Sequence, residues 1–172
     1  MRVVQAKKLS VEGFKPYGWA LLRPDKPADI ESASLRYWHD MVDLSNLGRL
    51  GTMGFMQMKR IPISCVTLQA LPNSIEMYLS LDGKPSLFFV APGDRSGKAP
   101  DEARIEAFIL EGGGSVIVEK GIWHVAPFPL SETSDFALGL HNTVILRKGD
   151  GFIVNEKEIS YVTLSEPVTI AL

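Results

Sequence analysis

The sequence predicts an all-β protein, folded as a sandwich or a barrel. Several short segments are either continuously apolar or alternate between apolar and polar residues. Turn-forming residues separate them, with 15 Gly and 11 Pro among the 172 residues. Helical patterns are few and short, and they do not alternate with the strands. This argues against repeated strand–helix–strand units and favours closed or stacked antiparallel sheets.

The predicted strands follow one another along the chain. They cover residues 54–58, 64–68, 74–81, 86–91, 115–125, 136–146 and 159–164. Asp82 and Gly83 form a tight turn between the third and fourth segments, and Gly121 makes a turn within the fifth.

The segment 74–81 alternates strictly and therefore has two distinct faces. One face is aliphatic, with Ile75, Met77, Leu79 and Leu81, and the other is polar, with Glu76, Tyr78 and Ser80. Periodicity leaves two alternatives for the polar face. It lies in water on the outside of a sheet, or it forms a polar cluster that faces the interior and can host a site.

Helix signals are limited to two single turns. Ser10 is a predicted N-cap for a turn over 10–14, which Pro16 ends, and a second turn over 101–105 follows Pro100. Residues 23–34 form the longest irregular stretch and are expected to be a covering arm or a lid. With no repeat and no linker, the chain is expected to be one domain over 1–172.

Composition and charge exclude several function classes. A net charge of −2 and a pI of about 5.9 argue against a nucleic-acid partner. Lys7 and Lys8 interrupt any apolar run at the start, and no segment approaches the roughly 20 apolar residues of a membrane span, so we expect a cytoplasmic protein with no membrane partner. Cys65 stands alone, which excludes a disulfide framework and predicts a buried structural thiol.

Three histidines are the candidates for imidazole chemistry, and each has a structural alternative. His124 follows Trp123 on a predicted strand and is either a satisfied structural histidine or part of a site. His141 follows small residues on its face, which leave room for a ligand or for close sheet packing. His39 either caps a pocket or belongs to an interface. Sequence signatures of serine hydrolases, zinc proteases, P-loops and dinucleotide-binding folds are absent.

The spacing around Glu76 and His124 is similar to the two-motif pattern of the cupin superfamily. Glu76 precedes the turn residue Gly83, and His124 follows Gly121 after two residues. Where the first cupin motif carries two histidines, this chain has Gln69 and Leu71. The resemblance implies an all-β, cupin-type double-stranded β-helix, that is, a jelly-roll barrel, with one or two short helical turns.

Within the cupins, the chain resembles the ureidoglycolate lyase family. The matching segments occur in order along most of the chain, at 14–18 (FKPYG), 38–40 (WHD), 76–90, 106–108 (EAF), 121–124 and 135–136. The chain departs from the family at four polar positions, which are Ala70, Leu71, Glu106 and Val125 here. Glu76 replaces a glutamine and restores the cupin-type acid. Because arginine binds carboxylates bidentately, its loss at positions 70 and 106 removes two candidates for carboxylate recognition.

The resemblance implies an enzyme that releases urea and glyoxylate from ureidoglycolate in allantoin and purine breakdown. Glu76 and His124 would be the acid–base pair, in either assignment. The side chains implied to shape the substrate pocket are Gln69, Tyr78, His39, Trp123 and His141. A weakly held divalent metal on Glu76 and His124, with Gln69 assisting, is a further option.

Two other interpretations remain beside the enzyme. One is a non-catalytic cupin that binds a small molecule, which the lost basic residues favour. The other is a structural homodimer with a packed barrel interior. A homodimer is compatible with all three, and residues 54–58 (GFMQM) offer an apolar edge strand for it.

Overall fold

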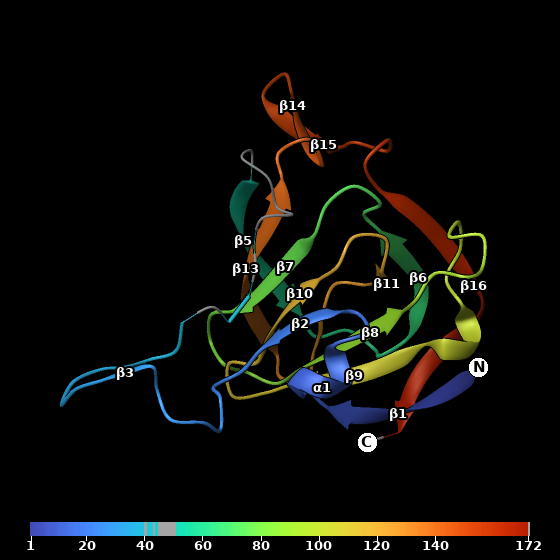
Figure 1. Cartoon of the computed structure of the whole chain (residues 1–172). Coiled ribbons are helices and arrows are strands. Elements are labelled where there is room, and N and C mark those ends of the chain that lie inside the picture. Colours follow the sequence, from blue (N-terminus) through green and yellow to red (C-terminus); the bar gives the residue numbers. More distant parts are fainter. Residues whose placement is uncertain (40, 43, 45–50, 172) are drawn as a thin grey trace.

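Two β-sheets form the body of the molecule (Figure 1). The computed structural model describes residues 1–39, 41–42, 44 and 51–171, so Asp40 of the family-like WHD segment lies outside the described residues. Among the described residues, the first sheet has seven strands in the order β11 (Trp123–His124), β6 (Cys65–Ala70), β16 (Ser160–Ala171), β1 (Arg2–Lys8), β9 (Glu106–Leu110), β8 (Ser86–Ala91) and β12 (Phe128–Pro129). The second has five, in the order β2 (Gly18–Leu21), β10 (Ser115–Val118), β7 (Glu76–Ser80), β13 (Thr133–His141) and β5 (Gly51–Lys59).

The first sheet closes on itself. β11 pairs with both β6 and β8, so β11, β6, β16, β1, β9 and β8 form a hydrogen-bonded ring. β1 pairs in parallel with β16 on one side and with β9 on the other, which joins the first and last long strands of the described chain. This architecture confirms the predicted all-β barrel.

Apolar side chains fill two separate spaces. On the ring strands, alternate residues such as Phe89 and Trp123 belong to a buried cluster enclosed by the ring. The residues between them point the opposite way, toward the second sheet, where Phe88 packs against Tyr78 with ring centroids 5.3 Å apart. This alternation decides which space each candidate site residue enters.

Both predicted helical turns are present and short. α1 (Val11–Phe14) follows Ser10, whose Oγ accepts a hydrogen bond from the Gly13 amide at 3.1 Å. The second turn, η2 (Glu102–Arg104), is a single 3₁₀ turn. Among the described residues, no helix combines the length and apolarity needed to cross a membrane.

Most of the predicted strands are confirmed, but the prediction of one strand is wrong. β8 has the predicted bounds, and β5, β6, β7 and β16 cover their predicted segments in large part. The single strand predicted over 136–146 is in fact divided. β13 ends at a turn in which the Val144 amide donates to the His141 carbonyl, and β14 (Ile145–Lys148) then forms an exposed hairpin with β15 (Gly151–Val154).

The arm predicted over 23–34 extends away from the barrel, at the left of Figure 1. It carries the two-residue strand β3 (Ile30–Glu31), which pairs with β4 (Arg36–Tyr37) just beyond the predicted bounds. Beyond β4, Trp38 and His39 line a hollow together with Met77 and Leu79, on the outer face of the second sheet. The end of the arm therefore lies on the opposite side of β7 from Glu76.

Candidate active site

Glu76 opens β7 with its side chain directed between the two sheets. The predicted alternation is present, because Tyr78 belongs to the core between the sheets whereas Ile75 and Met77 pack on the other side against Ile117. Glu76 shares the face of Tyr78 and is only 4% exposed. The polar face of this strand is thus an interior cluster, and the alternative of an outer face in water is excluded.

His124 reaches the same place from the first sheet. On β11 it lies opposite Gln69 of β6 and opposite Val90 of β8. Its ring is 1% exposed and stacks on Phe88 with an interplanar angle of 25°. Its Nε2 lies 2.7 Å from Oε2 of Glu76, so side chains from two different sheets form a buried pair.

A second hydrogen bond determines the tautomer of His124. Its Nδ1 lies 2.9 Å from the carbonyl oxygen of Ile122, and since a carbonyl only accepts, Nδ1 carries a proton. Two facing lone pairs would repel at 2.7 Å, so a further proton lies between Nε2 and Glu76. The Gln69 amide also donates to Oε2 of Glu76, at 3.2 Å, which favours a Glu76 carboxylate facing an imidazolium.

Tyr78 is the fourth polar side chain of this cluster, beside Glu76, His124 and Gln69. Burial raises the pKa of its phenol well above the usual 10, and the negative charge and hydrogen bond of Glu76 raise it further. The phenol therefore stays protonated and donates toward Glu76. Its ring meets the His124 ring edge-on, with centroids 6.0 Å apart.

Apolar layers lie on two sides of this polar cluster. On the side of Tyr78, the core between the sheets continues with Phe88 and its neighbours. On the other side is a small separate cluster formed by Leu71, Leu140, Val144 and Ile159. Leu71 follows Gln69 by two residues and therefore shares its face. These four residues form an apolar cap beside the Glu76–His124 pair.

Sequence reasoning missed one residue of this region, Tyr161. It lies on β16 directly opposite Gln69 of β6. Burial, followed by the charges of Glu76 and Glu156, raises the pKa of its phenol. Tyr161 falls inside the predicted strand 159–164, but only the register between β16 and β6 reveals that it lies opposite Gln69.

A sequence profile described as Ureidoglycolate lyase matches residues 1–170. The chain belongs to the ureidoglycolate lyase family. A ureidoglycolate lyase of Burkholderia mallei (strain NCTC 10229) is 27% identical over 165 residues, which cover 92% of this chain and 91% of that protein. One of Pseudomonas syringae pv. tomato is 25% identical over 157 residues, covering 88% and 86%. A solved structure with partial likeness is RmlC from Streptococcus suis in complex with dTDP-D-xylose, with a TM-score of 0.39 and 14% identity over 52% of this chain and 42% of that one.

The closed ring of the first sheet and the second sheet beside it confirm the predicted all-β barrel. The four departures from the family pattern have taken structural roles. Leu71 belongs to the apolar cap, while Ala70 and Val125 pack in or against the core enclosed by the ring. Glu106 pairs with Lys7 at 2.7 Å. Among the described residues, the buried charged side chains are those of Glu76 and His124 alone.

Three candidate pocket residues do not meet the Glu76–His124 pair. Trp123 points into the ring, on the opposite face of β11 from His124. His141 lies on the outer face of β13, where its Nδ1 contacts the Thr143 hydroxyl at 2.8 Å. His39 lies at the end of the arm and lines the hollow outside β7. Of the residues predicted to form the site, the structure brings together Glu76, His124, Gln69 and Tyr78.

The donor set does not fit a divalent metal. Among the described residues, no group of three or more His, Cys, Asp or Glu side chains lies close enough together to hold an ion. The candidate ligand atoms, Nε2 of His124 and Oε2 of Glu76, are two in number and face each other in a hydrogen bond.

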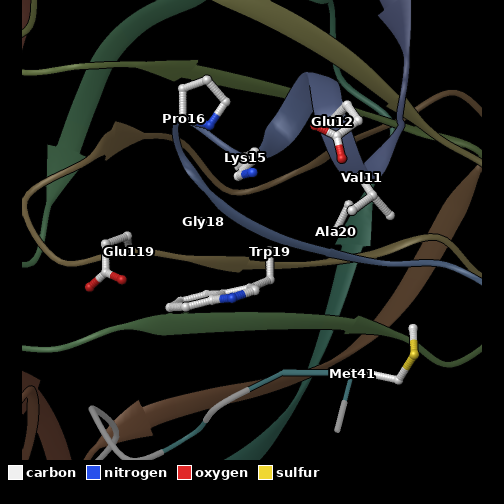
Figure 2. A pocket seen from close by; sticks show the side chains of 9 residues that line it. All are labelled: Val11, Glu12, Lys15, Pro16, Gly18, Trp19, Ala20, Met41 and Glu119. Atoms are coloured by element: carbon white, nitrogen blue, oxygen red, sulfur yellow. The ribbon is translucent and has the colours of Figure 1, made fainter. Parts of the chain in front are cut away.

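Figure 2 shows a hollow of about 340 Å³ that is distinct from the buried cluster. Its lining includes the indole of Trp19, the carboxylates of Glu12 and Glu119, and the ammonium of Lys15. Neither Glu76 nor His124 contributes to this lining.

Proposed function

We propose that this chain is a lyase that releases urea and glyoxylate from ureidoglycolate, and that Glu76 and His124 form its reaction centre. The observation that carries this proposal is the 2.7 Å contact between the two side chains inside a buried polar cluster. Relatives of the family, matched over most of their length, are named ureidoglycolate lyase. A close paralogue of the same chemistry would use the same pair on a related small polar substrate.

The reaction needs one proton removed and one delivered. Ureidoglycolate carries a hydroxyl and a ureido nitrogen on the same carbon. When the hydroxyl loses its proton, its oxygen forms the aldehyde carbonyl of glyoxylate, the carbon–nitrogen bond breaks, and the nitrogen leaves as urea after taking up a proton. No water is consumed and no electrons change hands, so an acid–base pair is sufficient.

The hydrogen bonds favour one assignment of roles. Gln69 and His124 both donate to Oε2 of Glu76, which supports an ionised carboxylate as the base for the hydroxyl proton. His124 would then supply the Nε2 proton to the leaving nitrogen. Ile122, by accepting from Nδ1, keeps Nε2 directed at the reacting atoms. Tyr78 would hold the Glu76 carboxylate in place from the side of the core.

A second candidate function is a small-molecule-binding protein without turnover. It is favoured by the lack of a buried Lys or Arg among the described residues, since a substrate carboxylate would find His124 as its only buried cation. The same assay separates the two candidates. Saturable binding of ureidoglycolate without release of urea supports the binding protein.

The test compares urea release by the wild-type protein with spontaneous decay of ureidoglycolate. We expect turnover above the spontaneous rate, and a loss of about 100-fold or more in Glu76→Gln and His124→Asn, the usual contribution of a general acid or base. Glu111→Gln is the matched control, because Glu111 is exposed and pairs with Lys8 at the surface. A wild-type rate equal to the spontaneous rate would reject the lyase.

Further properties belong to the same proposal. We propose that the chain acts as a single domain, which the pairing of β1 with β16 supports by tying together its first and last long strands. We also propose a cytoplasmic homodimer with no nucleic-acid or membrane partner. Met53 and Phe55, more than 60% exposed on the edge strand β5, support an apolar contact between two copies. Sedimentation of the wild type beside Phe55→Glu tests the dimer.

A further inference from the structure

Three side chains form a row across adjacent strands of the first sheet. His124 of β11 lies opposite Gln69 of β6, and Gln69 lies opposite Tyr161 of β16. Residues paired in this way share one face of a sheet, with side chains about 5 Å apart. Val162 and Leu68, the next pair along β16 and β6, belong to the core inside the ring, so the row faces the other way, toward Glu76.

Exposure rises steadily along this row. His124 is 1% exposed, Gln69 is partly buried, and Tyr161 is 53% exposed. Elsewhere the cluster is bordered by the Tyr78 and Phe88 layer on one side and by the apolar cap on the other. The polar row therefore runs from the buried pair toward the surface, and Tyr161 is its most exposed member.

We propose that Tyr161 is a substrate-contacting residue at the entrance of the Glu76–His124 site. This inference rests on the proposed function. Its phenol donates a hydrogen bond to the carbonyl or carboxylate oxygen of the entering substrate. Gln69, whose amide donates to Glu76, is the next polar side chain along the row. Burial is the largest cause of the raised pKa of the Tyr161 phenol, and the negative charge of Glu76 raises that pKa further. The second effect agrees with a short distance between the two side chains. The neutral phenol is the form that can donate.

The first experiment measures kcat and KM separately. Loss of one hydrogen bond to the substrate in Tyr161→Phe should raise KM about tenfold and leave kcat within about twofold, because the bond forms before the chemical step. Tyr37→Phe, a tyrosine exposed on β4, is the matched control and should leave both constants unchanged. A KM of Tyr161→Phe within twofold of wild type overturns the proposal.

A second experiment tests whether a bulky group at position 161 blocks the entrance. In Tyr161→Cys the new thiol is accessible, whereas the native Cys65 is buried. A bulky methanethiosulfonate label at position 161 should abolish turnover. The same label at Val66→Cys, a half-exposed position on the neighbouring β6, should leave turnover unchanged. Full turnover of the labelled Tyr161→Cys protein contradicts an entrance at this residue.

A third measurement does not depend on lyase activity. With carbon-13 in the tyrosine rings, the titration midpoint of Tyr161 should fall in Glu76→Gln, while Glu156→Gln reports the share of the other nearby carboxylate. An unchanged midpoint in Glu76→Gln would show that the charge of Glu76 does not act on Tyr161, and would contradict its place beside the site. If the midpoint falls but the wild type releases no urea, the lyase is rejected, and a chemical shift change of Tyr161 on addition of ureidoglycolate then supports its role in binding.

Discussion

Trp123 and His124 are neighbours on β11, yet their side chains enter two different cores. The indole of Trp123 packs inside the ring of the first sheet, and the imidazole of His124 faces Glu76 between the sheets. One strand therefore supports the barrel with one residue and the candidate site with the next. The two functions can be separated by mutation.

Trp123→Phe tests that separation. The indole Nε1 is buried and has no hydrogen-bond partner among the described residues, so the substitution removes an unsatisfied donor while it leaves a small cavity. These effects oppose each other, and we expect a stability loss below about 2 kcal/mol in urea denaturation. KM and kcat should stay within twofold of wild type. A tenfold change in KM would instead place Trp123 in the substrate pocket.

Glu76 should also contribute to stability, because its partner is buried with it. In Glu76→Leu, His124 loses its partner inside the protein, and we expect unfolding to become easier by about 3–5 kcal/mol. Glu76→Gln should cost at least about 1 kcal/mol less than Glu76→Leu, since its amide can still donate to Nε2 of His124. Equilibrium unfolding of the two variants gives the difference. Equal costs would show that the hydrogen bond contributes nothing.

The apolar cap is tested by Leu71→Ala. Leu71 is 2% exposed among Leu140, Val144 and Ile159, and truncation of such a side chain costs about 2–5 kcal/mol. Leu81→Ala is the control, since Leu81 is 55% exposed and should change stability by less than about 0.5 kcal/mol. Chemical denaturation of both proteins provides the comparison. A cost for Leu71→Ala as small as the control would mean that the cap is not packed.

The faces of the strands could be predicted from sequence, but not which face is inside. The alternation around Glu76 predicts that Tyr78 and Ser80 share its face of the strand, and the structure agrees. Whether that face meets water depends on the second sheet, which is assembled from segments distant in sequence. The polar face is the interior one here, and the aliphatic face of Met77 lies outside.

The pair Glu76 and His124 could be predicted because both lie at spaced motif positions, whereas the rest of the site depends on register. His141 lies on the outer face of β13, and Tyr161 comes next to Gln69 only because β16 pairs with β6 in this register. Strand β1 was also beyond prediction, because Lys7 and Lys8 obscure its pattern and its partner β16 lies at the other end of the chain. Long-range pairing of this kind leaves no local signal.

Cys65 should behave as an inert structural thiol in the folded protein. Burial raises its pKa to about 12, and the Thr67 carbonyl is the acceptor for its Sγ. The folded-state pKa lies above the unfolded value of about 8.5, so the stability contribution is complete below that pH and is lost as the pH rises toward 12. We expect no reaction with a disulfide reagent at pH 8 unless denaturant is added. Rapid labelling of the native protein would contradict the burial.

The junction of β2 and β10 requires a glycine at position 18. Gly18 has φ +138°, and a Cβ built there would lie 2.1 Å from the carbonyl oxygen of Ile117. That oxygen belongs to the backbone of β10 and cannot move without breaking the pairing of Trp19 with Ile117. Gly18→Ala should therefore cost about 3 kcal/mol or more in thermal or urea unfolding.

Gly54→Ala is the matched control for this prediction. Gly54 lies within strand β5, and a Cβ there would meet no atom within 4 Å. Alanine also lowers the backbone entropy of the unfolded chain, so we expect stability to rise by about 0.4–1 kcal/mol. Because both substitutions add one methyl group to a glycine in a strand of the second sheet, their opposite signs would isolate the steric contact with Ile117. A Gly18→Ala protein as stable as Gly54→Ala would show that β2 can be displaced from β10 at no cost.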